Sequence, residues 1–171
     1  MSRDQQATLI TLGLMGIAVV LNSTVLRVIA IGGVTPDLVL ILLVFLAVRR
    51  GSMSGQVAGF TIGVVEDLAS LAPLGFHALL RTLLGFAAGR LHGYLFLDPV
   101  LMPFLLVVAV GIIKGLLAAA AAAAFAVPTD FGVLGGVFWI EVAYTGALAP
   151  PLFLLLSRLR LLRPSKRQVV R

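Results

Sequence analysis

Residues 63–81 read GVVEDLASLAPLGFHALLR and place two acids, a histidine and an arginine within an otherwise apolar chain. Pro73 and Gly75 divide this stretch into two halves, which predicts a tight turn between two helices. Consecutive helices joined by so short a turn lie antiparallel and side by side. The stretch therefore predicts a helical hairpin whose charged residues gather near the turn.

The composition of the whole chain places this hairpin in a membrane. Of the 171 residues, 60% are hydrophobic and only 12% are charged, and the mean hydropathy is +1.13. A soluble domain carries about 25% charged residues, so a chain this apolar cannot cover a water-facing surface. A spanning helix needs about 20 mostly apolar residues, which gives room for roughly five to seven spans. We expect an all-α polytopic membrane protein, a single six-helix membrane domain over residues 1–171 with spans at about 8–30, 35–49, 52–70, 73–91, 99–126 and 132–157.

The basic residues predict the orientation of these spans. With the N-terminus in the cytoplasm, ten of the thirteen Lys and Arg residues lie on that face, and the opposite loops carry acids but no Lys or Arg. Because cytoplasmic loops are enriched in Lys and Arg, this pattern predicts an N-in, C-in topology and accounts for the net charge of +6 without nucleic acid. Residues 158–171 form a basic cytoplasmic tail, either an anchor for anionic lipid or a docking segment for an acidic partner.

The residue types exclude most catalytic chemistry. The chain has no cysteine and only two histidines, which excludes thiol catalysis and Cys- or His-rich metal sites. It contains no G-x-S-x-G, P-loop or H-E-x-x-H motif. His77, Asp67 and Ser70 have the residue types of a triad, but nothing beside them suggests an oxyanion hole. We expect no catalytic residue, no cofactor and no metal, and a protein that is not an enzyme.

Glycines recur every four residues along the third and fourth predicted spans. Small residues at this spacing let the backbones of membrane helices approach closely. Two interpretations remain open, namely packing of the two helices against each other and a groove for the helix of a partner protein. The glycines of this helix-packing or partner face are Gly51, Gly55, Gly59, Gly63, Gly85 and Gly89.

Charged residues inside the spans predict a buried polar cluster. An unpaired charge at the bilayer centre costs about 3 kcal/mol, so each such residue needs a partner. Because the two stripes end in Asp67 and Arg81, we expect these residues, with Glu66, to face each other near the outer leaflet. The predicted structural cluster consists of Glu66, Asp67, Arg81, Arg27 and His77.

Lys114 and Glu141 predict a second ion pair, deeper in the bundle. Measured from the loop that joins the fifth and sixth spans, they lie about 18 Å and 14 Å deep at a rise of 1.5 Å per residue. A lysine side chain can bridge that difference. The pair is either a structural link that fixes the register of two helices or part of a proton or substrate path.

Three ordered motifs resemble those of the MreD family, the rod shape-determining membrane protein of bacteria. Pro36 and Asp37 open the first of them and also read as a helix start, since proline suits the first helical position and aspartate the positive helix end. Pro73 and Gly75 form the turn of the third. The motifs are Pro36-Asp37-Leu38-Val39-Leu40, Gly59-Phe60-x-x-Gly63-x-x-x-Asp67, and Pro73-Leu74-Gly75-Phe76-His77-Ala78-Leu79 followed by Gly85-Phe86-x-x-Gly89-Arg90-Leu91.

The resemblance, which covers about residues 35–92, implies a location and partners. It implies a multi-pass protein of the bacterial inner membrane, in the elongasome that directs peptidoglycan synthesis. The implied partner is the transmembrane helix of MreC, with MreB, RodZ, RodA and a class B penicillin-binding protein contacted indirectly, besides membrane lipids. The implied fold is similar to the substrate-binding subunits of energy-coupling-factor transporters. The expected function is a non-catalytic scaffold that binds MreC and helps to determine rod cell shape.

A second hypothesis belongs to another class, the small-molecule-binding subunit of a vitamin-type transporter. Such a subunit needs an outward pocket with convergent polar and aromatic groups. The sixth span offers Trp139, Tyr144 and Glu141 for this purpose. Copurification distinguishes the two, because one predicts a helix-bearing protein partner and the other a small molecule. An intramembrane enzyme ranks third, since no motif supports it.

Overall fold

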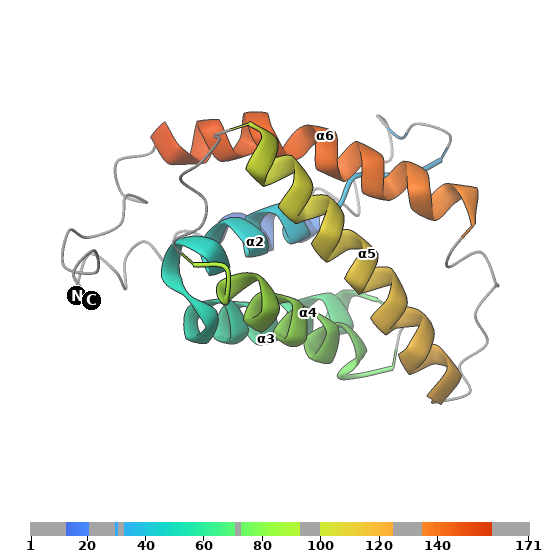
Figure 1. Cartoon of the computed structure of the whole chain (residues 1–171). Helices are drawn as coiled ribbons and strands as arrows, with labels where there is room; N and C mark the ends of the chain where they lie inside the picture. The colour runs from blue at the N-terminus through green and yellow to red at the C-terminus, as the bar shows by residue number, and fades with distance from the viewer. Residues whose placement is uncertain are drawn as a thin grey trace.

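The computed structural model describes residues 13–20, 30, 33–70, 73–92, 100–124 and 135–158. In these ranges the chain folds into α-helices that follow the predicted spans closely, which confirms the all-α prediction for this part of the chain (Figure 1). The helices are a segment at residues 13–20, α2 (Leu38–Arg50), α3 (Ser52–Ala69), α4 (Phe76–Gly89), α5 (Leu101–Ala124) and α6 (Gly136–Arg158).

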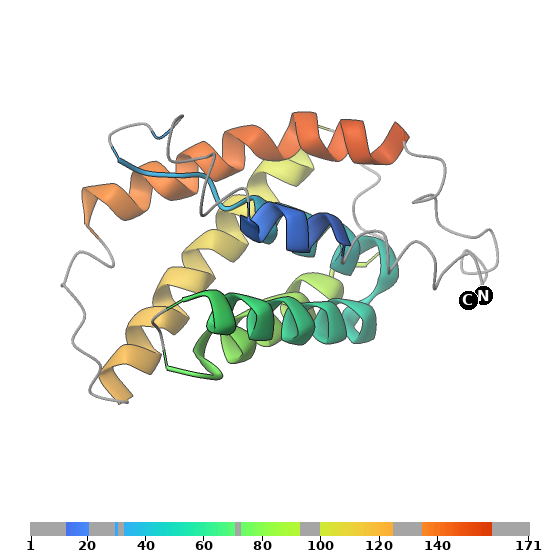
Figure 2. The same ribbon diagram turned by 180° about the vertical axis from the view of Figure 1, so that it is seen from behind.

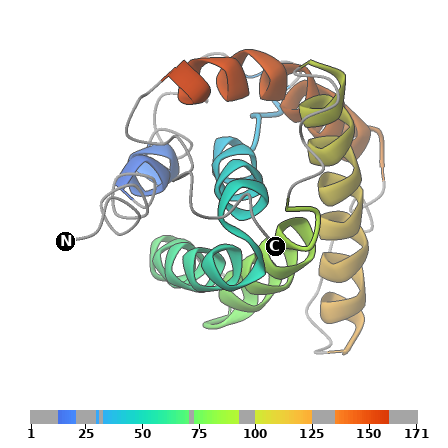
Figure 3. The ribbon, with the colours of Figure 1, turned by 60° about the vertical axis from the view of Figure 1, so that its left-hand side comes forward.

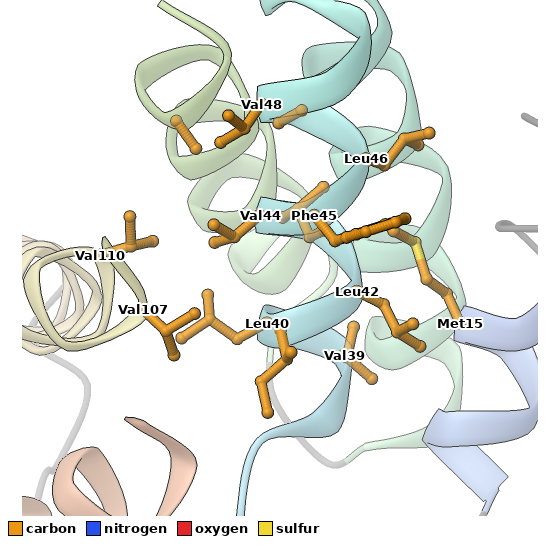
Figure 4. Packing of buried hydrophobic residues seen from close by; sticks show 14 of the residues in the cluster. Met15, Val39, Leu40, Leu42, Val44, Phe45, Leu46, Val48, Val107 and Val110 are labelled. Carbon is orange, nitrogen blue, oxygen red and sulfur yellow. The ribbon is translucent and has the colours of Figure 1, made fainter. Parts of the chain in front are cut away.

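α2 lies at the centre of the bundle. Every residue from Val39 to Val48 is buried, and a helix that is hydrophobic all round must be covered on every face. The segment 13–20, α3, α4, α5 and α6 surround it (Figure 3), and Figure 2 shows the segment 13–20 beside it. Met15, Val107 and Val110 reach α2 from the neighbouring helices (Figure 4). The side chains of α2, together with those that pack against them, therefore form the core of the described bundle.

Local chemistry fixes both ends of α2. The Asp37 side chain accepts a hydrogen bond from the backbone N–H of Leu40 at 2.9 Å, which makes Asp37 the N-cap. The sequence pattern placed Pro36 inside the helix, whereas the structure places it just before the cap, fully buried. At the other end Gly51 has φ 85°, a value that a residue with a side chain rarely adopts, and the chain turns directly into α3.

α3 and α4 form the predicted hairpin and pack more closely than any other described pair of helices. A Cβ added at Gly55 would touch the backbone oxygen of Gly85, and one added at Gly85 would touch that of Gly55. A Cβ at Gly59 would lie 2.6 Å from the carbonyl carbon of Arg81. Only glycine fits at such distances, so these residues bring the two backbones together. Equivalent approaches occur at Gly63 and Gly89.

α5 and α6 are the two described helices long and apolar enough to cross a membrane, at Leu101–Ala120 and Gly136–Arg158. They diverge toward the C-terminal end of α5 (Figure 1), and only about a third of each apolar window is buried. α2 and α4 contain 13 and 14 residues and rise about 20 Å, less than the ~30 Å of a hydrocarbon core. Six complete membrane crossings therefore stay a prediction.

Candidate functional site: a buried chain of ion pairs

Five charged side chains from five elements form one continuous series of contacts at the end of the bundle where α2 starts and α3 ends. Each contact joins a cation to a carboxylate over 3.1 Å or less. We call this series the ion-pair chain. In order along the series, its members are Glu66 of α3, Arg81 of α4, Asp37 before α2, Lys114 of α5 and Glu141 of α6.

Arg81 holds the first half of the ion-pair chain. Its Nε donates to Glu66 Oε2 at 2.8 Å and its Nη2 donates to Glu66 Oε1 at 2.7 Å. This is the bidentate arrangement that gives an arginine–carboxylate pair both strength and a fixed geometry. Nη2 also donates to Asp37 Oδ1 at 3.1 Å, and the side chains of Arg81 and Asp37 are each only 6% exposed. Two carboxylates thus compensate one buried guanidinium.

Asp37 joins the two polar sites that the sequence treated as separate. Its Oδ1 faces Arg81, while its Oδ2 accepts a hydrogen bond from Lys114 Nζ at 2.7 Å. Its backbone N–H donates to Thr145 Oγ1 at 3.0 Å, which ties the start of α2 to α6. Sequence reasoning assigned Asp37 to a helix start and a family motif and did not identify its ion pairs. One sequence signal could have indicated these ion pairs. Asp37 directly precedes a helix that is apolar on all sides and therefore buried, so the acid itself needs a buried partner.

Lys114 and Glu141 lie together, as the sequence predicts. Lys114 Nζ donates to Glu141 Oε1 at 2.7 Å, and both side chains are about 30% exposed. Because Lys114 also binds Asp37, this pair is not isolated but ends the longer chain. The sequence left open a structural link and a proton or substrate path, and both interpretations stay predictions.

Asp67 has a different role from the one expected. The sequence paired it with Arg81, but its carboxylate instead accepts hydrogen bonds from the backbone N–H groups that begin α4. These donors are Gly75 N at 2.9 Å, His77 N at 2.9 Å and Ala78 N at 3.1 Å. His77 Nδ1 lies 2.9 Å from the same carboxylate. The first N–H groups of a helix have no intrahelical acceptor, so an acid from the preceding helix satisfies them.

Several other residues that the sequence singled out lie outside the ion-pair chain or outside the described residues. Arg27 lies outside the described residues, as does the tail beyond Arg158. Gly51 lies in the α2–α3 turn, where an added Cβ would meet nothing within 4 Å, so its position reflects its positive φ and not close packing. Trp139 is more than half exposed and lines neither of the two cavities described below.

Two cavities meet at the ion-pair chain. The first has a volume of about 350 Å³, and its wall includes all five members of the chain and His77. The second, of about 230 Å³, lies between α5 and α6 and has a more apolar wall that includes Phe138. Lys114 and Glu141 line both. Within the described residues, no three acidic or histidine side chains come together as a group that could hold a metal ion.

A comparison with known protein families identifies the family of this chain. The family described as rod shape-determining protein MreD matches residues 2–159. The chain belongs to the MreD family. No curated protein and no solved structure gives a significant match. The predicted family is confirmed, with its role in rod shape determination and its place among bacterial membrane proteins. The expected fold similarity to energy-coupling-factor subunits stays a prediction.

The residues that carried the MreD resemblance build the site. Asp37, from the first motif, is the central carboxylate of the ion-pair chain. Asp67, from the second, binds the start of α4, and Gly75, from the third, supplies one of the N–H groups that it accepts. Pro73 accepts a hydrogen bond from Phe76 N at 3.1 Å within the turn. In this MreD-family chain the motifs thus lie where α2 starts, α3 ends and α4 starts, and they hold these three helix ends together.

Glu66, not Asp67, should be energetically coupled to Arg81. Replacing Glu66 by glutamine weakens two charge-assisted hydrogen bonds and should lower the free energy of unfolding by about 1.5–3 kcal/mol. In an Arg81→Met background the same change removes an uncompensated buried carboxylate, so it should be neutral or stabilising. Reversible unfolding in mixed micelles measures both steps. Asp67→Asn, the matched control, should cost the same in both backgrounds, and coupling below about 0.5 kcal/mol for Glu66 would contradict the assignment.

Proposed function

We propose that this MreD-family chain is a non-catalytic, multi-pass scaffold of cell-wall elongation in the bacterial inner membrane. It binds the transmembrane helix of MreC and thereby helps to direct peptidoglycan synthesis. MreB, RodZ, RodA and a class B penicillin-binding protein are contacted indirectly. The observation that carries this proposal is the family match over residues 2–159.

The packing of the described helices narrows the surface available to a partner helix. The glycines of α3 and α4 face each other within the hairpin, so their close-packing surface is already occupied. α6 buries only a third of its apolar window against the described residues and exposes large side chains, among them Ile140 and Leu154, which lie on the same side of the helix. A partner helix can replace lipid on such a surface. Lipid tails are as apolar as the side chains of the partner, so packing and not the hydrophobic effect decides whether the two helices associate. We assign the MreC helix to this outer face of α6.

In a rod-shaped host that lacks its own copy of the gene, cells should become round and this chain should restore rods. A photo-crosslinking amino acid at Ile140 or Leu154 should then capture MreC in cells. The expected result combines restored shape with a crosslinked band that an antibody against MreC recognises.

Two control positions make this experiment specific. Phe45 is 1% exposed in the core, so a crosslinker there should capture no partner. Phe60 is 57% exposed on the outer face of α3 and reports whether MreC prefers that helix. Normal rods in the absence of the gene would contradict the role in shape. Capture of MreC from Phe60 alone would leave the scaffold role standing and overturn the assignment to α6.

A further inference from the structure

The two cavities differ in polarity and share one ion pair. The first, of about 350 Å³, has the ion-pair chain in its wall, whereas the wall of the second, of about 230 Å³, is mainly apolar. Lys114 and Glu141 line both cavities, and their side chains are 29% and 31% exposed. Because the same ion pair borders both cavities, one molecule can occupy both if it combines a polar head with an apolar chain.

The second cavity has the size and the surroundings for a hydrocarbon chain. It lies between α5 and α6, and its wall follows α5 from Val107 to Ala118, which spans about 17 Å at a rise of 1.5 Å per residue. One turn of a helix about 10 Å in diameter fills roughly 400 Å³, more than this whole cavity, so a partner helix does not fit. Only about a third of the apolar window of each of the two helices is buried against the described residues, so membrane lipid reaches both.

The hydrogen bonds that the shared ion pair can still form select the head. The ammonium group of Lys114 has three N–H donors, of which two bind Asp37 Oδ2 and Glu141 Oε1. Within the described residues the other oxygen of Glu141, Oε2, accepts no hydrogen bond. One donor and one acceptor therefore remain on neighbouring groups. A hydroxyl group both donates and accepts, so a head with hydroxyl groups can bind the two at once.

A charged head would compete with the ion pair itself. A ligand ammonium group competes with Lys114 for Glu141, and a ligand carboxylate or phosphate competes with Glu141 for Lys114. Either exchange separates two groups that lie 2.7 Å apart and leaves one partly buried charge without its partner, which is unfavourable. A neutral head with hydroxyl groups forms its hydrogen bonds to both residues while the pair stays intact.

We propose that the two cavities together bind a neutral amphiphile, a lipid with hydroxyl groups on its head and a hydrocarbon chain. The head binds Lys114 and Glu141 from the first cavity, and the chain lies between α5 and α6 in the second. This role is separate from the outer face of α6 assigned to MreC. Either proposal can fail without the other, because one is read from lipid labelling of the purified protein and the other from crosslinking in cells.

Photoaffinity labelling of the full chain in lipid nanodiscs tests the proposal. The probe is a 1-monoacylglycerol with a diazirine in its acyl chain, and mass spectrometry should locate the label on residues of the second cavity such as Val107 and Phe138. Unlabelled 1-monolaurin should suppress this labelling at about a tenfold lower mole fraction in the bilayer than methyl laurate, laurate or dodecylammonium, because only its head forms both hydrogen bonds with the ion pair intact. Equal potency of any of these three would overturn the choice of head, and labelling that 1-monolaurin does not suppress would overturn the site.

Two variants locate the hydrocarbon chain. Ala118 lines the second cavity, so Ala118→Phe should fill part of it and lower the labelling by about tenfold. Ala120 is exposed on the same helix and lines neither cavity, so Ala120→Phe is the matched control and should leave the labelling unchanged. Equal labelling of the two variants would place the chain on the outer surface of the bundle and overturn the proposal. The competition series uses the unsubstituted protein, so it decides the outcome even if Ala118→Phe does not fold.

Discussion

Replacing Gly59 by leucine should separate α3 from α4 and cause most of the protein to be lost during extraction from the membrane. A Cβ at this position would already lie 2.6 Å from the carbonyl carbon of Arg81 and 3.0 Å from the backbone nitrogen of Thr82. Overpacking a core usually costs about 1–3 kcal/mol because side chains rotate away. Here the obstructing atoms belong to the backbone, which cannot rotate away, so the loss of stability should exceed that range.

Gly136→Leu is the matched control for this substitution. Gly136 is exposed at the start of α6, and an added Cβ there would meet nothing within 4 Å. Gly136 is the first residue of α6, so its substitution gains less helix propensity than that of Gly59 in the interior of α3, and a lower stability of Gly59→Leu therefore reports close packing. Size-exclusion profiles and thermal melting of the two variants measure it. A Gly59→Leu protein as monodisperse and as stable as Gly136→Leu would mean that the α3–α4 interface tolerates wider spacing.

Hydropathy and the positions of Gly and Pro predicted the helices well, because both signals depend on residues that are close together in the sequence. Apolar runs bounded by Gly51, by Pro73 and by Gly32-Gly33 are local signals, and the hairpin of α3 and α4 follows from one short turn. Glycines spaced four residues apart also predict, from local sequence alone, that a neighbouring helix packs closely at this stripe. They do not specify which helix that is. The structure places that partner within the same hairpin, where Gly55 and Gly85 approach each other.

Pairings between charges were harder to predict because they depend on competition and on distant neighbours. Asp67 lies on the same stripe that points toward Arg81, but the backbone N–H groups at the start of α4 compete for it and bind it. Asp37 and Lys114 are 77 residues apart, so their contact requires the knowledge that α5 packs beside the start of α2. No periodicity in the sequence carries that information. The sequence therefore named four of the five members of the ion-pair chain and missed Asp37, while their partners depended on the arrangement of the helices.

Replacing Lys114 by methionine should destabilise the protein by about 3–5 kcal/mol, the cost of removing one partner from a buried ion pair. The substitution raises the excess negative charge of the ion-pair chain from one to two, since three carboxylates then share Arg81 alone. Asp37 should bear most of this cost because its side chain is 6% exposed, whereas that of Glu141 is 31% exposed and can be partly solvated. Reversible unfolding in mixed micelles measures the loss.

The order of rescue then distinguishes a chain of ion pairs from an isolated pair. Asn at position 37 can still accept the N-cap hydrogen bond from Leu40, so Asp37→Asn removes charge without uncapping α2. In the Lys114→Met background, Asp37→Asn should restore more than half of the lost stability, and Glu141→Gln should restore less. An isolated Lys114–Glu141 pair, as expected from the sequence alone, predicts the opposite order. Greater rescue by Glu141→Gln would therefore remove Asp37 from the centre of the site, because the charge left by Lys114 would then reside on α6.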